Sequence, residues 1–286
     1  MTTKHLNPDF RWSFSKLSTF EHCPLAFYLE YVCDQNRDDE LPNFYSEYGR
    51  FAHSLLEAYF KNQIPAFCLA DAWKKGYEAA ITCPPPPYPV GYNEKAFNAG
   101  LKYFETFNGF GPEWETVSVE DKFVIDIDGN QMVGIADLVL RNKESGELWV
   151  VDHKSKSKSS MRKDMNTYRH QLYIYAIWCK ERFGVWPSML SFNLFKEGTM
   201  VDEKFSEDQL EETKRWIKDI IRSIKAHDAF GDWKPCIPPD TTREPFFCRW
   251  VCGVNDQCER YQEVRQAVIE EWKAKRQAEE EMSLGY

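Results

Sequence analysis

The spacing of apolar residues changes along the chain and divides it into helical and extended parts. Helical spacing covers the ranges 13–33, 48–62, 67–80, 94–107, 164–183 and 206–227. Between 116 and 154 the period falls to two, which predicts three antiparallel strands in a meander. An apolar run at 188–195 predicts a fourth strand, and residues from 259 onward predict a charged helix.

This order of elements predicts an α/β fold with a mixed central sheet flanked by helices. The sheet combines the antiparallel meander with the further strand. We expect a single domain over residues 1–286. Within it, 13–115 is mainly helical, 116–230 is the α/β core, and 231–286 holds a group of cysteines and the C-terminal helix.

Composition and charge narrow the class of protein. The chain has 286 residues, of which 43% are hydrophobic and 15% aromatic, enough for a sizeable core. A polar N-terminus and the lack of an apolar run of about 18 residues predict a cytoplasmic protein with no membrane contact. The net charge of −9 argues against a protein that coats DNA nonspecifically. A local basic strip can still meet phosphate: Lys154, Lys156, Lys158, Arg162 and Lys163.

Two aspartates occupy positions in the predicted sheet where an ionised carboxylate is costly. Asp137 shares a strand face with Val139, which predicts that it points toward the protein interior. Asp152 and Lys154 continue the face of Val150, and residues two apart on a strand point the same way at roughly 7 Å. The sequence therefore places charged side chains on a face that should be apolar.

The predicted hairpin brings the two carboxylates together. A turn centred in the segment RNKESGE places Asp137 opposite Asp152, and like charges at that spacing destabilise a sheet. A divalent cation removes the conflict, with the backbone carbonyl of His153 as a further oxygen ligand. Lys154 can then stabilise charge on a scissile phosphate or orient the attacking water. The alternative is that Asp137 begins a turn and Asp152 forms a surface salt bridge with Lys154.

Four features along the chain form a further pattern. They are a helical segment with a Cys-Pro pair, a Gly-xxx-His-xx-Leu-Glu motif, two strand motifs and a Gln-xxx-Tyr motif: SFSKLSTFEHCPLAFYLEYV, GRFAHSLLE, IAD with VVDHK, and QLYIY. Together they resemble the PD-(D/E)xK nuclease superfamily, specifically the RecB-like exonucleases that include CRISPR-adaptation nucleases, AddB-type nuclease domains and phage exonucleases. The proline of the family name is absent, because Ile135 and Ala136 precede Asp137. The resemblance implies a restriction-endonuclease-like core.

The resemblance also implies roles for individual residues. His53 is an additional metal ligand beside Asp137, Asp152 and the His153 carbonyl, Lys154 is the catalytic lysine, and Gln171 with Tyr175 lines the site. Four residues apart on one helix, Gln171 and Tyr175 do share a face. Glu57 and Glu120 are at most supporting residues around the ligands.

The nine cysteines favour a metal site over disulfides, because cytosolic thiols stay reduced. Cys248, Cys252 and Cys258 lie close in sequence, one ligand short of four. The resemblance implies that Cys23 is the fourth ligand and that the set holds a 4Fe–4S cluster. Structural zinc and no metal are the alternatives, and Cys236 is an alternative to Cys23.

These implications predict a Mg²⁺- or Mn²⁺-dependent deoxyribonuclease of the PD-(D/E)xK type in a bacterial, archaeal or phage-infected cell. We expect an exonuclease on single-stranded DNA or DNA ends, in recombination, repair, or phage or CRISPR DNA processing, with a recombination or CRISPR-adaptation protein as a partner. No Walker-type glycine loop occurs, so no use of ATP is expected. The alternative is a catalytically idle nuclease fold that binds nucleic acid or acts as an assembly subunit. Endonuclease activity and RNA substrates stay open.

Overall fold

The computed structural model describes residues 4–33, 42–86 and 90–284, which belong to two compact units. The sheet unit consists of residues 9–18 and 44–221. The cysteine unit comprises residues 1–8, 19–43 and 222–286, of which the described parts are 4–8, 19–33, 42–43 and 222–284. No described helix has both the length and the apolar character needed to cross a membrane.

The sheet unit is built on five strands that lie in chain order. They are β1 (Trp114–Ile127), β2 (Asn130–Asn142), β3 (Leu148–Lys154), β4 (Met189–Leu194) and β5 (Thr199–Lys204). β1, β2 and β3 are successively antiparallel, β4 is parallel to β3, and β5 is antiparallel to β4. This mixed sheet with flanking helices confirms the predicted fold class. β5 was not predicted.

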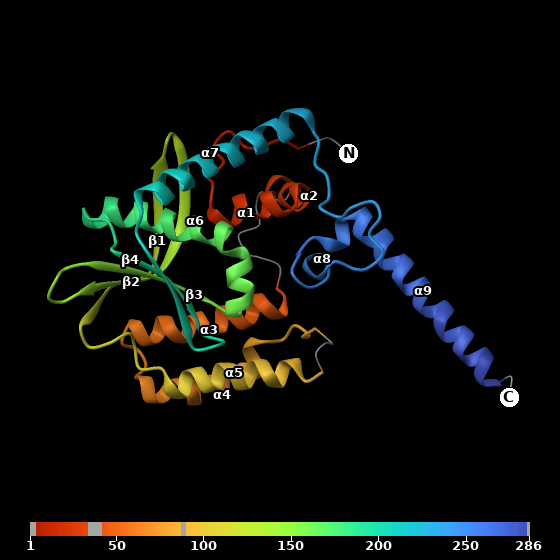
Figure 1. Ribbon diagram of the computed structural model, residues 1–286, viewed down its shortest axis with the longest axis horizontal. Helices are drawn as coiled ribbons and strands as arrows, with labels where there is room; N and C mark the ends of the chain where they lie inside the picture. Colours follow the sequence, from red (N-terminus) through yellow and green to blue (C-terminus); the bar gives the residue numbers. More distant parts are fainter. Residues whose placement is uncertain (1–3, 34–41, 87–89, 285–286) are drawn as a thin grey trace. The chain divides into compact units, whose positions relative to one another are not determined.

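Helices cover both faces of this sheet (Figure 1). α3 (Phe44–Phe60), α4 (Leu69–Ala80) and α5 (Tyr92–Thr106) lie together on one side, and α6 (Lys158–Phe183) lies on the other. The layer of α3, α4 and α5 packs on alternate sheet residues, among them Leu138, Leu140, Trp149 and Val151. Alternation along a strand therefore directs Asp137 and Asp152 to the opposite face.

Local sequence determines where α6 begins and ends. The Ser157 hydroxyl accepts a hydrogen bond from the backbone N–H of Ser160 and so caps the first turn of the helix. The helix thus begins at Lys158, six residues before the predicted start at 164. The helix ends at Gly184, which has a φ of 79° and makes the predicted C-cap. Because α6 starts shortly after β3, the catalytic candidates on β3 and α6 belong to one continuous segment.

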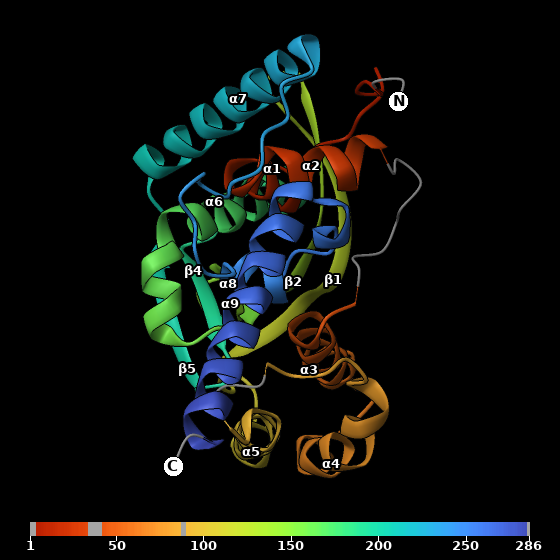
Figure 2. The same ribbon diagram turned by 90° about the vertical axis from the view of Figure 1, so that its right-hand side faces the viewer.

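The cysteine unit is mostly helical in its described residues. It contains α2 (Pro24–Phe27), η1 (Tyr28–Cys33), α8 (Phe246–Trp250), η3 (Asn255–Gln257) and α9 (Glu259–Leu284), of which α8 and α9 are neighbours in Figure 2. α1 (Phe14–His22) and α7 (Glu207–Phe230) contribute residues to both units. The helical range 13–33 is divided at Cys23, which occupies the N-cap position of α2 ahead of Pro24.

Candidate active site

The β2–β3 hairpin has the register that the sequence predicted. Leu138 pairs with Val151, and continuing this register by one residue places Asp137, in the middle of β2, opposite Asp152, near the end of β3. The backbone N–H of His153 donates a hydrogen bond of 2.8 Å to Oδ2 of Asp137. The two carboxylates are therefore held at the same end of the hairpin.

Asp152 is a fully buried carboxylate paired with Lys154. Its exposed fraction is 0%, and its Oδ2 lies 2.6 Å from Nζ of Lys154. Among the described residues, neither of its oxygens accepts a hydrogen bond of regular geometry. Burial raises the pKa of Asp152 to about 6, although Lys154 acts against this rise. A buried carboxylate with one ion pair and no regular hydrogen bond is suited to bind a cation.

A second group of ligand atoms joins α3 to the β1–β2 hairpin. One atom from each of His53, Glu120 and Asp137 lies within 4.8 Å of the others. Nδ1 of His53 is 3.6 Å from Oε1 of Glu120 and also 3.6 Å from Oδ2 of Asp137. Two carboxylates and an imidazole at this spacing suit one divalent ion. Asp152 is outside this group of three, so its joint binding of the ion stays a prediction.

Glu120 faces Asp137 because of the register of the β1–β2 hairpin. Asp128 and Gly129 form its turn, with φ of 52° and 81°, and their Asp-Gly pair is typical of a two-residue hairpin. Counting back from this turn places Glu120 opposite Asp137. Glu120 itself has a φ of 51°, a left-handed conformation that costs on the order of 1–3 kcal/mol and often marks functional sites. Glu120 therefore lies among the possible ligand atoms, and the Asp-Gly pair is the signal in the sequence that could have located it.

The hydrogen bonds of His53 orient its ring toward the carboxylates. Its Nε2–H donates a hydrogen bond of 2.8 Å to the backbone carbonyl of His153. That bond leaves Nδ1 directed at Glu120 and Asp137, the orientation in which a histidine nitrogen can bind a metal. Burial disfavours charge on His53, but Asp137 and Glu120 outweigh it and raise its pKa to about 9. Binding of a cation at Nδ1 must therefore release a proton.

His153 contributes its backbone to the site, and its ring belongs to the core. Nδ2 of Asn193 donates to Nδ1 of His153 at 3.0 Å, and the ring stacks on Phe60 and Phe110. Burial and the positive charges of His53 and Lys154 hold its pKa well below the ordinary value. The predicted role of the His153 carbonyl as a metal ligand competes with its hydrogen bond from His53.

α6 brings Gln171 and Tyr175 to the same site. Nε2 of Gln171 donates to the Tyr175 hydroxyl at 2.7 Å, and Oε1 of Gln171 is buried with no hydrogen-bond partner among the described residues. Burial raises the pKa of Tyr175 well above its ordinary value, and the charges of Asp152 and Asp137 raise it further. The pair therefore stays neutral, with a free amide oxygen beside the carboxylates.

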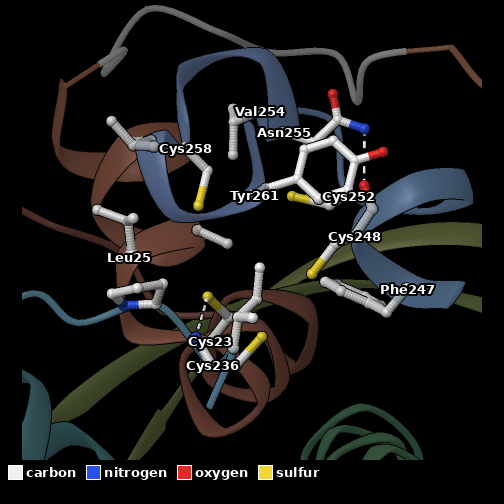
Figure 3. A pocket seen from close by; sticks show the side chains of 14 residues that line it. Cys23, Leu25, Cys236, Phe247, Cys248, Cys252, Val254, Asn255, Cys258 and Tyr261 are labelled. Atoms are coloured by element: carbon white, nitrogen blue, oxygen red, sulfur yellow. Dashed lines mark hydrogen bonds between the residues drawn. The ribbon is translucent and has the colours of Figure 1, made fainter. Parts of the chain in front are cut away.

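Five cysteines of the cysteine unit line one cavity (Figure 3). The four predicted ligands are among them, and the fifth is Cys236: Cys23, Cys236, Cys248, Cys252 and Cys258. The rest of the lining is largely apolar, including Leu29 and Val254. Burial raises the pKa of Cys252 to about 12, so binding of a metal here releases protons. The structure thus brings together cysteines that lie more than 200 residues apart.

Glu120→Gln should weaken metal binding, because it removes one of the charges around Nδ1 of His53. We expect the apparent Kd for Mn²⁺ to rise about 10–100-fold, as when a metal's supporting ligands are lost. Isothermal titration with Mn²⁺ measures the change. Glu57→Gln is the matched control, since Glu57 is on α3 and pairs with Lys61 at 2.6 Å. An unchanged Kd in Glu120→Gln would exclude Glu120 as a ligand.

Comparison with known proteins gives one family match and distant structural neighbours. The family model of the PD-(D/E)XK nuclease superfamily matches residues 11–259. No curated protein matches the chain. A Eubacterium rectale protein provisionally named an exonuclease is 13% identical, with a TM-score of 0.44, over 79% of this chain and 83% of that protein. The protein SSO0001 is 16% identical, with a TM-score of 0.37, over 90% of this chain and 89% of its own.

Proposed function

The chain belongs to the PD-(D/E)XK nuclease superfamily, and from this premise we propose that it is a Mg²⁺- or Mn²⁺-dependent DNA exonuclease. The observation that carries the proposal is the buried pair of Asp152 and Lys154 beside the group of His53, Glu120 and Asp137. A purely structural ion pair does not require a second, converging set of carboxylates and an imidazole. These oxygen and nitrogen donors suit Mg²⁺ or Mn²⁺.

The residues of the site would have different roles in phosphodiester hydrolysis. Asp137, Glu120 and His53 would hold the cation, and Asp152 on β3 would be a further ligand. When bound, the cation polarises the phosphate and lowers the pKa of the attacking water. The ammonium of Lys154 stabilises negative charge that develops on the phosphate oxygens. Oε1 of Gln171 has no donor among the described residues, so it would accept a hydrogen bond from the attacking water and orient that water.

Groups beside Lys154 are suited to a single DNA strand. Nζ of Lys156 lies 4.3 Å from the ring centre of Tyr168 and 2.6 Å from a carboxylate oxygen of Asp164. Arg162 and Lys163 are exposed on the first turns of α6. Cations next to an aromatic ring favour a phosphate backbone with unpaired bases. A single strand or a frayed end is therefore the proposed substrate, and a recombination or CRISPR-adaptation protein stays a predicted partner.

We propose in addition that the cysteine cavity holds a 4Fe–4S cluster. Tetrahedral zinc with bonds of about 2.3 Å requires sulfur atoms about 3.8 Å apart. In the described part of the chain, no three cysteine sulfurs lie within 4.8 Å of one another. A cluster binds its thiolates on separate iron atoms and accepts a wider spacing in an apolar cavity. Its role here is to join the N-terminal and C-terminal segments of the cysteine unit.

The experiment that tests the exonuclease proposal compares linear and circular single-stranded DNA of one sequence in Mn²⁺ and in Mg²⁺. We expect progressive shortening of the linear strand, an intact circle, and slower digestion of blunt duplex. Asp137→Asn is the inactive control. Cutting of the circle at the same rate would identify an endonuclease instead. No cleavage by the native chain in either metal would favour the catalytically idle scaffold.

A further inference from the structure

The cysteine cavity contains one thiol more than a four-ligand cluster uses. Cys236 lies in the segment between α7 and α8, and Figure 3 shows its sulfur beside those of Cys23 and Cys248. Its thiol is within hydrogen-bonding reach of both, and its backbone N–H donates to Sγ of Cys23 at 3.4 Å. Cys236 is also the exposed member of the five, since the other four are buried or half-buried.

Backbone N–H groups lie near three of the four assigned ligand sulfurs, and the sulfur of Cys236 lies near its own N–H. Sγ of Cys23 accepts from the N–H groups of Ala26 and Cys236. Sγ of Cys252 accepts from the N–H of Val254, and Sγ of Cys258 accepts from backbone groups that follow it at the start of α9. Such N–H donors orient ligating sulfurs and tune a cluster. Among the described residues, Sγ of Cys248 has no such backbone donor, and the Cys236 thiol is within hydrogen-bonding reach of it.

We propose that Cys236 is a reserve ligand of the cluster, a thiol that is free in the intact protein and binds iron when Cys23 or Cys248 is lost. This inference rests on the proposed cluster. In a variant without Cys23 or Cys248, the iron atom left without its cysteine would exchange a bound water for the Cys236 thiolate, and the water and the thiol proton would pass to solvent beside the exposed Cys236. Cys252 and Cys258 have no such neighbour among the described cysteines, so their loss is not replaced.

The first test compares iron and sulfide content after anaerobic reconstitution of alanine variants. Cys236→Ala should bind as much iron as the native chain. Cys23→Ala and Cys248→Ala should each keep about half or more of the absorbance near 400 nm, whereas Cys252→Ala should lose nearly all of it. Adding Cys236→Ala to either of the first two variants should remove what remains.

The second test follows the Cys236 thiol directly and does not need a variant that folds poorly. Iodoacetamide is applied to the folded native protein, and labelled cysteines are identified by mass spectrometry. We expect Cys236 to be labelled like the half-buried Cys68, and the ligands to be protected like the buried Cys179. In Cys248→Ala, Cys236 should become protected, because it now binds iron.

Two outcomes would overturn this inference while leaving the cluster in place. One is equal loss of iron in Cys248→Ala, Cys23→Ala and Cys252→Ala. The other is protection of Cys236 in the native protein together with labelling of one of the four assigned ligands. A native chain without iron and sulfide would overturn the proposed cluster itself, and that result is seen before any variant is made.

Discussion

Replacement of Asp152 by asparagine should abolish DNA cleavage and leave the fold in place. The carboxamide has nearly the same shape, so the buried position on β3 stays filled. It cannot supply the negative charge that balances a cation and Lys154, which lies 2.6 Å away. We expect a loss of at least about a thousandfold in rate, equivalent to about 4 kcal/mol of transition-state stabilisation.

The measurement is the initial rate on a labelled linear single strand at saturating Mn²⁺, with circular dichroism to check the fold. Asp71→Asn, at an exposed position on α4, is the matched control and should keep the native rate. Lys154→Met should lose activity to a similar extent and keep its affinity for Mn²⁺, because the lysine is not a ligand. Native activity in Asp152→Asn would contradict the assignment of the site to β3.

The β2–β3 hairpin, which carries proposed catalytic residues, is predictable because its register follows from local rules. The turn between β2 and β3 is short, so its centre can be located to within a few residues. Alternation along the strands then directs Asp137 and Asp152 to one face. Glu120 escaped the same reasoning. The apolar residues of β1 include Val119, Phe123 and Ile125, so alternation assigns Glu120 to the opposite, polar side of the strand, and the pattern does not reveal its left-handed φ of 51°.

The edge strand β5 and the exact geometry of the ligand atoms are harder to predict from the sequence. β5 carries only Met200 and Val201 as apolar residues, and its side chains are mostly half-buried or exposed. An edge strand of this kind forms because the backbone of β4 offers hydrogen-bonding groups to it. The hydrophobic pattern of the edge strand itself is therefore weak. Likewise, the orientation of His53 depends on the carbonyl of His153, which is 100 residues away in sequence.

The cysteine cavity marks the limit of inference from local spacing. Cys248, Cys252 and Cys258 are near one another in sequence, but no periodicity relates them to Cys23. A resemblance to a family supplied that link, and the structure adds that Cys236 belongs to the same cavity. Its contact with Cys23 arises where residues 234–236 run alongside the start of α2, as in the hydrogen bond from Leu25 N–H to the Lys234 carbonyl.

Cys252→Ala should destabilise the cysteine unit far more than the loss of one side chain would. A cluster that joins Cys23 to Cys252 closes a very long loop, and closure of such a loop is worth on the order of 5 kcal/mol. A loss of that size corresponds to a fall in Tm of about 10 °C. Differential scanning fluorimetry measures it, and limited proteolysis should cut first within residues 231–258.

The same variant separates the structural role of the cluster from the chemistry of cleavage. All the proposed catalytic residues belong to the sheet unit, so the soluble fraction of Cys252→Ala should still cleave DNA in Mn²⁺. Cys68→Ala, a half-buried cysteine outside the cavity, is the control and should keep the native Tm. If Cys252→Ala kept both its Tm and its protease pattern, the cysteines would not join the two segments. If it folded normally but lost all cleavage, the cluster would take part in catalysis or DNA binding.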